Sequence, residues 1–197
     1  TSTMNKTNTI IQSSVLNDGI QYWNITCTDL AGNRAGSTPR TITIDTTPPN
    51  ITLISPSDLS QVNSTIHFTY FVNDTLSNIP NCSLIINGSA ESNKSAIEKG
   101  AQYFDLRIPL TGWYNWSVNC TDGMGNNGSS ETWRIYVLPP DLIITSSNIS
   151  INNISPKEGD NITINATVYN IGGSDAFNVT IQFFVGDPDA GGTQVNG

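Results

Sequence analysis

Short stretches in which apolar and polar residues alternate recur along this chain, separated by turn-forming residues. In 64–72, every second residue from Ile66 to Val72 is apolar, and in 112–121 the apolar row includes Trp116 and Cys120. Residues two apart lie on the same face of a strand. No helical period appears, so the pattern predicts an all-β protein.

The stretch 46–138 holds enough of these segments for a complete domain. Strands are predicted at 50–55, 64–72, 80–86, 101–108, 112–121 and 131–138, with a short seventh near 88–92. Asn87-Gly88 predicts a two-residue type I′ hairpin. Strands of this number and length predict an immunoglobulin-like (Ig-like) sandwich.

Part of this domain is written twice. Trp23–Asn33 returns as Trp116–Asn126, with the cysteines 93 positions apart (120 − 27 = 93). Since residues 1–45 match only the second half of 46–138, we expect them to be the C-terminal half of an Ig-like domain. A repeat of this length is a whole β domain, so the fold class is tandem Ig-like β-sandwiches.

Residues 139–197 begin a different module, with strands predicted at 141–146, 161–169 and 177–185. The apolar rows within 162–168 and 177–185 are expected to face inward. Double prolines at 48–49 and 139–140 mark the linkers. Because such segments are stiff and extended, the modules are expected to form a rod.

The motifs support a resemblance. Residues 1–138 resemble the Ig-like repeats of bacterial and archaeal surface proteins in two segments, Trp23–Asn33 and Asp45–Pro49, although Leu138 stands where the repeat places Asp45. Residues 139–197 resemble the N-terminal part of a cell-adhesion-related (CARDB) β-sandwich. The matching stretches are Pro140-Asp141-Leu142-Ile143, Glu158-Gly159-Asp160 and Val168-Tyr169-Asn170-Ile171-Gly172. The resemblance implies the fold and a surface location, and says little about a ligand.

The charge of the chain excludes some classes of binding partner. Charged residues make up 12% of the chain, about half of an ordinary soluble protein's roughly 25%, and the net charge is −8. Phosphate binding needs clustered Lys and Arg, so we expect no nucleic-acid partner. Without an apolar run of about 18 residues, we expect no membrane insertion in this segment.

Two cysteines are predicted to pair. Cys82 and Cys120 both face inward by alternation, and the extracellular character of the composition favours a disulfide between the two sheets over two buried thiols. The closed loop of about 39 residues would stabilise the fold by roughly 4 kcal/mol in the chain-entropy model. The repeat places the partner of Cys27 outside residues 1–197.

Asn-x-Ser/Thr sequons are unusually frequent. They begin at 16 of the 24 asparagines, where chance would give about five. Polar residues alternating on outward strand positions explain part of the excess, and N-glycosylation of several sites explains the rest. The best candidates are Asn24, Asn63, Asn73, Asn81, Asn87, Asn93, Asn115, Asn119, Asn127, Asn161, Asn165 and Asn178; the others are Asn5, Asn50, Asn148 and Asn153.

No cofactor is expected, with one alternative left open. Asp29, Asn33 and Asp45 could converge at the first module junction and offer oxygen ligands to Ca²⁺. The other interpretation, which the loss of this aspartate at Leu138 favours, is that they are ordinary turn residues whose side chains bind the local backbone.

Nothing in the sequence positions a catalytic group. The one histidine, His67, falls on an outward strand face, and no nucleophile, zinc or phosphate-loop motif occurs. Of the tryptophans, Trp23, Trp116 and Trp133 are expected in cores, and Trp113 is the candidate for an exposed sugar-stacking site. We therefore expect that this protein is not an enzyme.

These features predict a structural segment of an extracellular, N-glycosylated surface protein: part of a surface layer, a stalk or a filament. Its partners would be further copies of itself or neighbouring surface proteins. An adhesin that binds a carbohydrate or protein ligand is the alternative. A further alternative is a set of accessory domains of a surface hydrolase.

Overall fold

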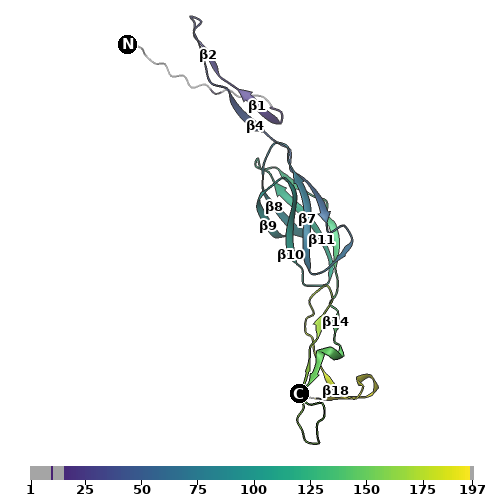
Figure 1. Ribbon diagram of the computed structural model, residues 1–197. Helices are drawn as coiled ribbons and strands as arrows, with labels where there is room; N and C mark the ends of the chain where they lie inside the picture. Colours follow the sequence, from purple (N-terminus) through teal and green to yellow (C-terminus); the bar gives the residue numbers. More distant parts are fainter. Residues whose placement is uncertain (1–9, 11–15, 196–197) are drawn as a thin grey trace.

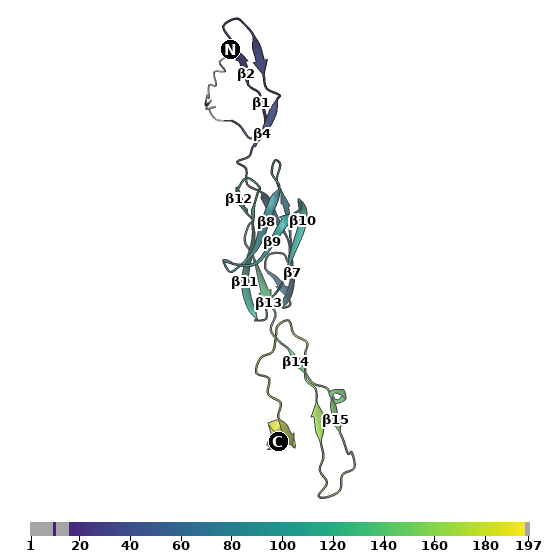
Figure 2. The same cartoon turned by 90° about the vertical axis from the view of Figure 1, so that its left-hand side faces the viewer.

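The computed structural model describes residue 10 and residues 16–195, and every strand in it belongs to a β-sheet. Three parts follow one another along a single long axis in both views (Figures 1 and 2). They are a pair of hairpins at 19–44, a sandwich at 50–137 and a more open set of strands at 142–195. The all-β prediction is confirmed.

The central sandwich has two sheets. One has the strand order β10-β7-β5, and the other β6-β13-β11-β8-β9, with β12 also paired to β11. All pairs are antiparallel except β6 with β13. The strands are β5 (Asn50–Ser55), β6 (Ser60–Val62), β7 (Thr65–Asn73), β8 (Ile79–Ile86), β9 (Ser89–Ile97), β10 (Gly100–Arg107), β11 (Gly112–Thr121), β12 (Asn127–Ser129) and β13 (Trp133–Val137).

The alternation in the sequence builds the core between these sheets. Phe68, Tyr70 and Val72 from β7 meet Trp116 and Val118 from β11, and each of these five side chains is fully buried. A buried side chain of this size contributes roughly 1.5–3 kcal/mol relative to an exposed one. The predicted hairpin is present, because Asn87 and Gly88 have positive φ angles of 49° and 86° between β8 and β9.

Cys82 and Cys120 form a disulfide, as predicted, but its expected position between the two sheets is wrong. The two residues are direct partners on the neighbouring strands β8 and β11 of one sheet, with Cα atoms 4.0 Å apart. Such a spacing is close to that of a non-hydrogen-bonded antiparallel pair. Alternation gives the face that a residue occupies; it cannot say which strand lies opposite. Cys27 is free and exposed.

The first part repeats two strand pairings of the central sandwich, β11 with β13 and β11 with β12. β1 (Gly19–Trp23) pairs with β4 (Arg40–Ile44), and β2 (Thr26–Thr28) with β3 (Arg34–Gly36). Adding 93 to these registers gives those of β11 with β13 and β12. No second sheet covers the hairpins within the described residues, so Trp23, expected in a core, is 41% exposed.

The third part has three two-stranded sheets, β14-β17, β15-β16 and β18-β19. Its strands are β14 (Leu142–Ile143), β15 (Ile149–Ile151), β16 (Ile164–Ala166), β17 (Tyr169–Asn170), β18 (Phe183–Val185) and β19 (Thr193–Val195). They are shorter than predicted. Most of the residues expected to face inward, including Ile162, Phe177 and Ile181, are exposed, because no described strand covers them; Ala166 and Val168 are half-buried. Short 3₁₀ turns lie at Ser146–Asn148 and Pro188–Ala190. None of the described helices is long and apolar enough to cross a membrane.

Tyr70 yields a test of the core. Its side chain is fully buried and its hydroxyl has no hydrogen-bond partner among the described residues. Since an unpaired buried hydroxyl is unfavourable, Tyr70→Phe should raise the unfolding free energy by about 1 kcal/mol at neutral pH. Tyr114→Phe, which removes a hydroxyl that donates to Leu110 O at 3.1 Å, should lower it.

The same variant has a pH signature. Burial raises the pKa of Tyr70 from 10.0 to about 12. A pKa raised on folding means that stability is complete below the unfolded value and is lost as the pH rises from 10 toward 12. The advantage of Tyr70→Phe in urea titrations should therefore widen above pH 10. A constant gap between pH 7 and 11 would contradict this burial.

Candidate functional sites at the module junctions

The first junction, called the upper junction here, is the linker 45–49 between β4 and β5 together with the loops of the central sandwich that it contacts. Asp45 is 8% exposed, although it lies in the five-residue linker between β4 and β5. Its carboxylate accepts hydrogen bonds from the Ser77 hydroxyl and from Thr47 N, at 3.1 Å in the second case. Its carbonyl accepts one from Asn126 Nδ2 at 3.0 Å. The linker is thus bound to the top of the central sandwich.

Asn126 is held in place by its own loop. Asp122 accepts hydrogen bonds from Met124 N and Asn126 N at 2.9 and 2.8 Å, and from Asn126 Nδ2 at 2.8 Å. Burial by itself would raise the pKa of Asp122, but these bonds and a further one from Gly125 N outweigh it, and the pKa lies below its ordinary value. Asp122 therefore stays ionised and fixes the amide that receives the linker.

The same loop occurs in the first part of the chain. Asp29 accepts hydrogen bonds from Ala31 N, Asn33 N and Asn33 Nδ2. The Asn33 side-chain bond is the largest cause of its lowered pKa. Asp29 and Asn33 therefore act as turn residues, as one of the two alternatives held, and they do not converge with Asp45. Their loop joins β2 to β3, whereas Asp45 follows β4.

Asp45 meets two other carboxylates instead. Asp45, Asp74 and Asp122 are all buried, and each offers an oxygen within 4.8 Å of the others. Hard oxygen donors of this kind suit Ca²⁺. Each carboxylate also has a local task, because Asp74 Oδ1 accepts from Leu76 N and Ser77 N at 2.9 and 2.7 Å. Sequence reasoning missed Asp74 and Asp122 because they come from loops distant in the chain.

The lower junction is the linker 138–141 between β13 and β14, and it is held by an apolar contact and backbone hydrogen bonds in place of carboxylates. Leu138, at the position equivalent to Asp45, lies against Gly173, where an added Cβ would be 2.5 Å from the Leu138 Cβ. Gly173 N donates to Pro139 O at 2.9 Å, and Gly173 O accepts from Ser64 N at 2.6 Å. A glycine is required because any side chain would separate the two backbones. The departure at Leu138 thus follows from the module that comes next.

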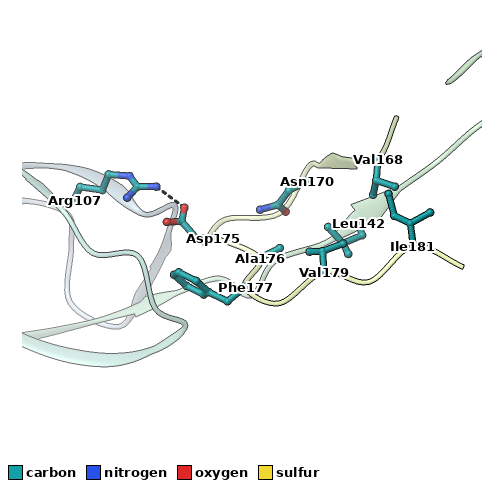
Figure 3. A pocket seen from close by; sticks show the side chains of 9 residues that line it. All are labelled: Arg107, Leu142, Val168, Asn170, Asp175, Ala176, Phe177, Val179 and Ile181. Carbon is teal, nitrogen blue, oxygen red and sulfur yellow. Dashed lines mark hydrogen bonds and ion pairs between the residues drawn. The ribbon is translucent and has the colours of Figure 1, made fainter. Parts of the chain in front are cut away.

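Around this contact, further bonds join the sandwich to the third part. Arg107 forms an ion pair with Asp175, whose N–H donates to Pro109 O at 3.1 Å. The hydroxyls of Thr111 and Ser174 are 2.8 Å apart. An open hollow of about 550 Å³ adjoins this ion pair, and apolar residues such as Val179 line it. Figure 3 shows the ion pair at one end of these lining residues.

The sequons lie on the surface. All twelve leading candidates are exposed; of the other four, Asn50 is exposed, Asn148 and Asn153 are half-buried, and Asn5 lies outside the described residues. Five of the twelve share the outer face of the β9-β8-β11-β12 sheet: Asn81, Asn93, Asn115, Asn119 and Asn127. This face is uncharged in its middle, where serine and threonine alternate with asparagine across the strands. Exposure makes these amides accessible to modification.

Two other predictions concern single side chains. His67 lies on the outer face of β7 as expected, with Nδ1 2.6 Å from Asp105 Oδ1 and its ring stacked on Tyr103. Trp116 is fully buried, whereas Trp113 is 49% exposed, as the alternation predicted.

Comparison with known proteins bears on the last part of the chain. Residues 139–197 match the CARDB family model. The resemblance of this segment is thereby confirmed, and the Gly172-Gly173 pair that docks on the linker belongs to it. No curated protein matches the chain.

The solved structures that are similar to this chain at low identity include a set of fibronectin(III)-like modules and a mannanase. The fibronectin(III)-like modules of Clostridium thermocellum CbhA share 14% identity and a TM-score of 0.37, covering 60% of this chain and 61% of theirs. The endo-beta-1,4-mannanase from Thermotoga petrophila has the same identity and TM-score, covering 47% of this chain and 20% of its own. The chain therefore spans less than two thirds of either protein.

The upper junction can be tested at Asp122. Asp122→Ala leaves the N–H groups of Met124 and Asn126 without their acceptor and releases Asn126 from Asp45 O, so the unfolding free energy should fall by about 2 kcal/mol. Asp29→Ala, in the exposed copy of the loop, is the matched control and should cost clearly less by the same urea titration. Equal losses would show that contact with the linker adds nothing.

The lower junction can be tested at Gly173. In Gly173→Ala the new Cβ would overlap Leu138, so the third part should separate from the sandwich while the sandwich itself stays folded. Small-angle X-ray scattering should then report a broader range of shapes, and proteases should cleave faster near 138–141. Gly36→Ala, where the nearest atom is 3.5 Å away, is the control and should change neither readout.

Proposed function

We propose that this chain is a structural segment of an extracellular, N-glycosylated surface protein, in which tandem β modules form a stiff stalk, filament or surface layer. The observation that carries the proposal is that each described linker is bound to the module that follows or precedes it. Asp45 is bound by Ser77 and Asn126, and Leu138 packs on Gly173. Linkers of free modules would have exposed residues at these positions.

The composition supports the same role. A protein with 12% charged residues has few charges to keep its surface hydrated. Glycans on exposed asparagines would supply that hydration and would shield sheet faces and edges from pairing with neighbours. The Cys82–Cys120 disulfide supports an oxidising compartment such as the cell exterior. These features belong together in a protein crowded on a surface.

The proposal is tested on native material from the source cells. Immunogold electron microscopy should place the protein outside the cell envelope, in a lattice or in fibres. Mass spectrometry of peptides should find sugars on several of the exposed sequons. Unmodified peptides together with an intracellular location would contradict the proposal.

A carbohydrate-binding module is the second candidate, because one specific feature favours it. Trp113 and Tyr136 are direct partners on β11 and β13, with ring centroids 5.2 Å apart, and the Arg134 guanidinium lies 4.8 Å above the Trp113 ring. Exposed aromatic rings flanked by hydrogen-bond donors can bind the apolar faces of sugars. Binding of the sugar-free protein to a glycan array with a micromolar Kd would favour this role if Trp113→Ala abolished the binding.

A further inference from the structure

Among the sequons, Asn115 has surroundings that the others on its sheet lack. Its side chain is exposed on the outer face of β11, and Trp113 precedes it by two residues on that same face. Side chains two residues apart on a strand are about 6.8 Å apart at their Cα atoms. A group attached to Asn115 therefore begins beside a half-exposed indole ring.

Arg134 shows that a group rooted beside Asn115 can reach this ring. Arg134 is the direct cross-strand partner of Asn115, yet its guanidinium lies over Trp113, which is two residues from Asn115 on β11, at 4.8 Å from the ring centroid. A sugar linked to the Asn115 amide starts from the neighbouring position at a comparable reach. The guanidinium also offers N–H donors to sugar hydroxyls on the same side.

Asn115 itself is firmly placed. Its backbone N–H donates to Asn87 Oδ1 at 2.9 Å, and its carbonyl accepts from Asn87 N at 2.9 Å. The side chain of Asn115 makes no hydrogen bond with the described residues, so its amide is available. Because the backbone is rigid, a sugar attached to the free amide can take few directions, which favours a single bound position for it.

We propose that Asn115 is glycosylated and that the first sugars of its glycan stack on the part of Trp113 that Arg134 leaves exposed, with the Arg134 guanidinium as a hydrogen-bond donor beside them. This inference rests on the proposed function, since it requires a glycosylating compartment. In the modification, Asn115 Nδ2 bonds to the anomeric carbon of a sugar from a lipid-linked sugar-diphosphate donor. The bond to the diphosphate breaks, and the amide loses one proton.

A sugar ring and the indole ring of Trp113 have complementary surfaces, which is the physical reason for stacking. One face of a pyranose ring presents C–H groups of slightly positive charge, and the indole face is negative and apolar. Trp113 in the sugar-free protein exposes about half of its surface, so a stacked sugar removes apolar area from water. The glycan would then stabilise the β11–β13 strand pair in addition to shielding the outer face of the sheet.

A matched control lies on the same strand. Asn119 is also exposed on the outer face of β11, but the residue two positions before it is Ser117, and its cross-strand partners are Ser83 and Ser129. A glycan at Asn119 therefore has the same strand and the same sheet face without an aromatic ring. The two sites differ in the feature that the proposal concerns.

The experiment compares six forms of the protein made in its source cells: the parent and Trp113→Ala, each alone, with Asn115→Gln and with Asn119→Gln. Site occupancy in each form is quantified by mass spectrometry. With Trp113 present, loss of the Asn115 glycan should reduce the folding equilibrium constant by about two- to tenfold. In the Trp113→Ala background, the same loss should have no effect. The Asn119→Gln change should have equal effects in both backgrounds.

A direct readout separates stacking from a general effect on stability. In NMR spectra of the occupied parent, sugar protons should show nuclear Overhauser contacts to the Trp113 indole. An unoccupied Asn115, absent contacts at an occupied site, or an equal glycan effect in both backgrounds would overturn the proposal. If no sequon at all is occupied, the proposed glycoprotein role fails as well; if other sites are occupied, only this inference fails. Binding of free glycans by the sugar-free parent would point to a ligand site instead.

Discussion

Short linkers that are bound at their ends constrain this molecule more than any other feature. Five residues separate β4 from β5, and four separate β13 from β14. A chain of so few residues, two of them prolines, cannot fold back, so each module must continue in the direction of the strand before it. The extended arrangement in Figures 1 and 2 follows from this.

The two linkers are bound by opposite chemistries. Asp45 enters a polar socket in which a serine hydroxyl and an asparagine amide satisfy its oxygens, and Leu138 packs on a glycine that leaves room for it. Asp45 follows β4 and Leu138 follows β13, and each of the two residues suits the surface of the next module, which it contacts. This explains why the repeat, whose strand registers recur residue for residue, has Leu138 in place of Asp45.

Much of the fold could be predicted from the sequence, because alternation is a local property. The strand at 50–55, the Asn87-Gly88 hairpin, the buried Trp116 and the exposed Trp113 all follow from period-two patterns and turn chemistry. The 93-residue offset correctly relates the first hairpins to strands of the central sandwich. These features need no knowledge of what lies across the sheet.

What the sequence could not supply was contact between distant segments. The disulfide joins neighbouring strands and not opposite sheets, because strand order is a tertiary property. Asp74 and Asp122 join Asp45, while Asp29 and Asn33 stay in their own turn, because loop ends meet only once the sandwich forms. Alternation predicts that the apolar rows at 162–168 and 177–185 face inward, yet burial also requires a covering sheet.

The central claim is that bound linkers hold the modules in a fixed relation, and a distance distribution between two modules tests it most directly. Cys27 is free and exposed on the first hairpins, and Ser95 is exposed on β9 of the central sandwich, so Ser95→Cys provides a second site for a spin label. Double electron–electron resonance should give one narrow distance distribution. A broad distribution, such as a flexible tether produces, would contradict the account.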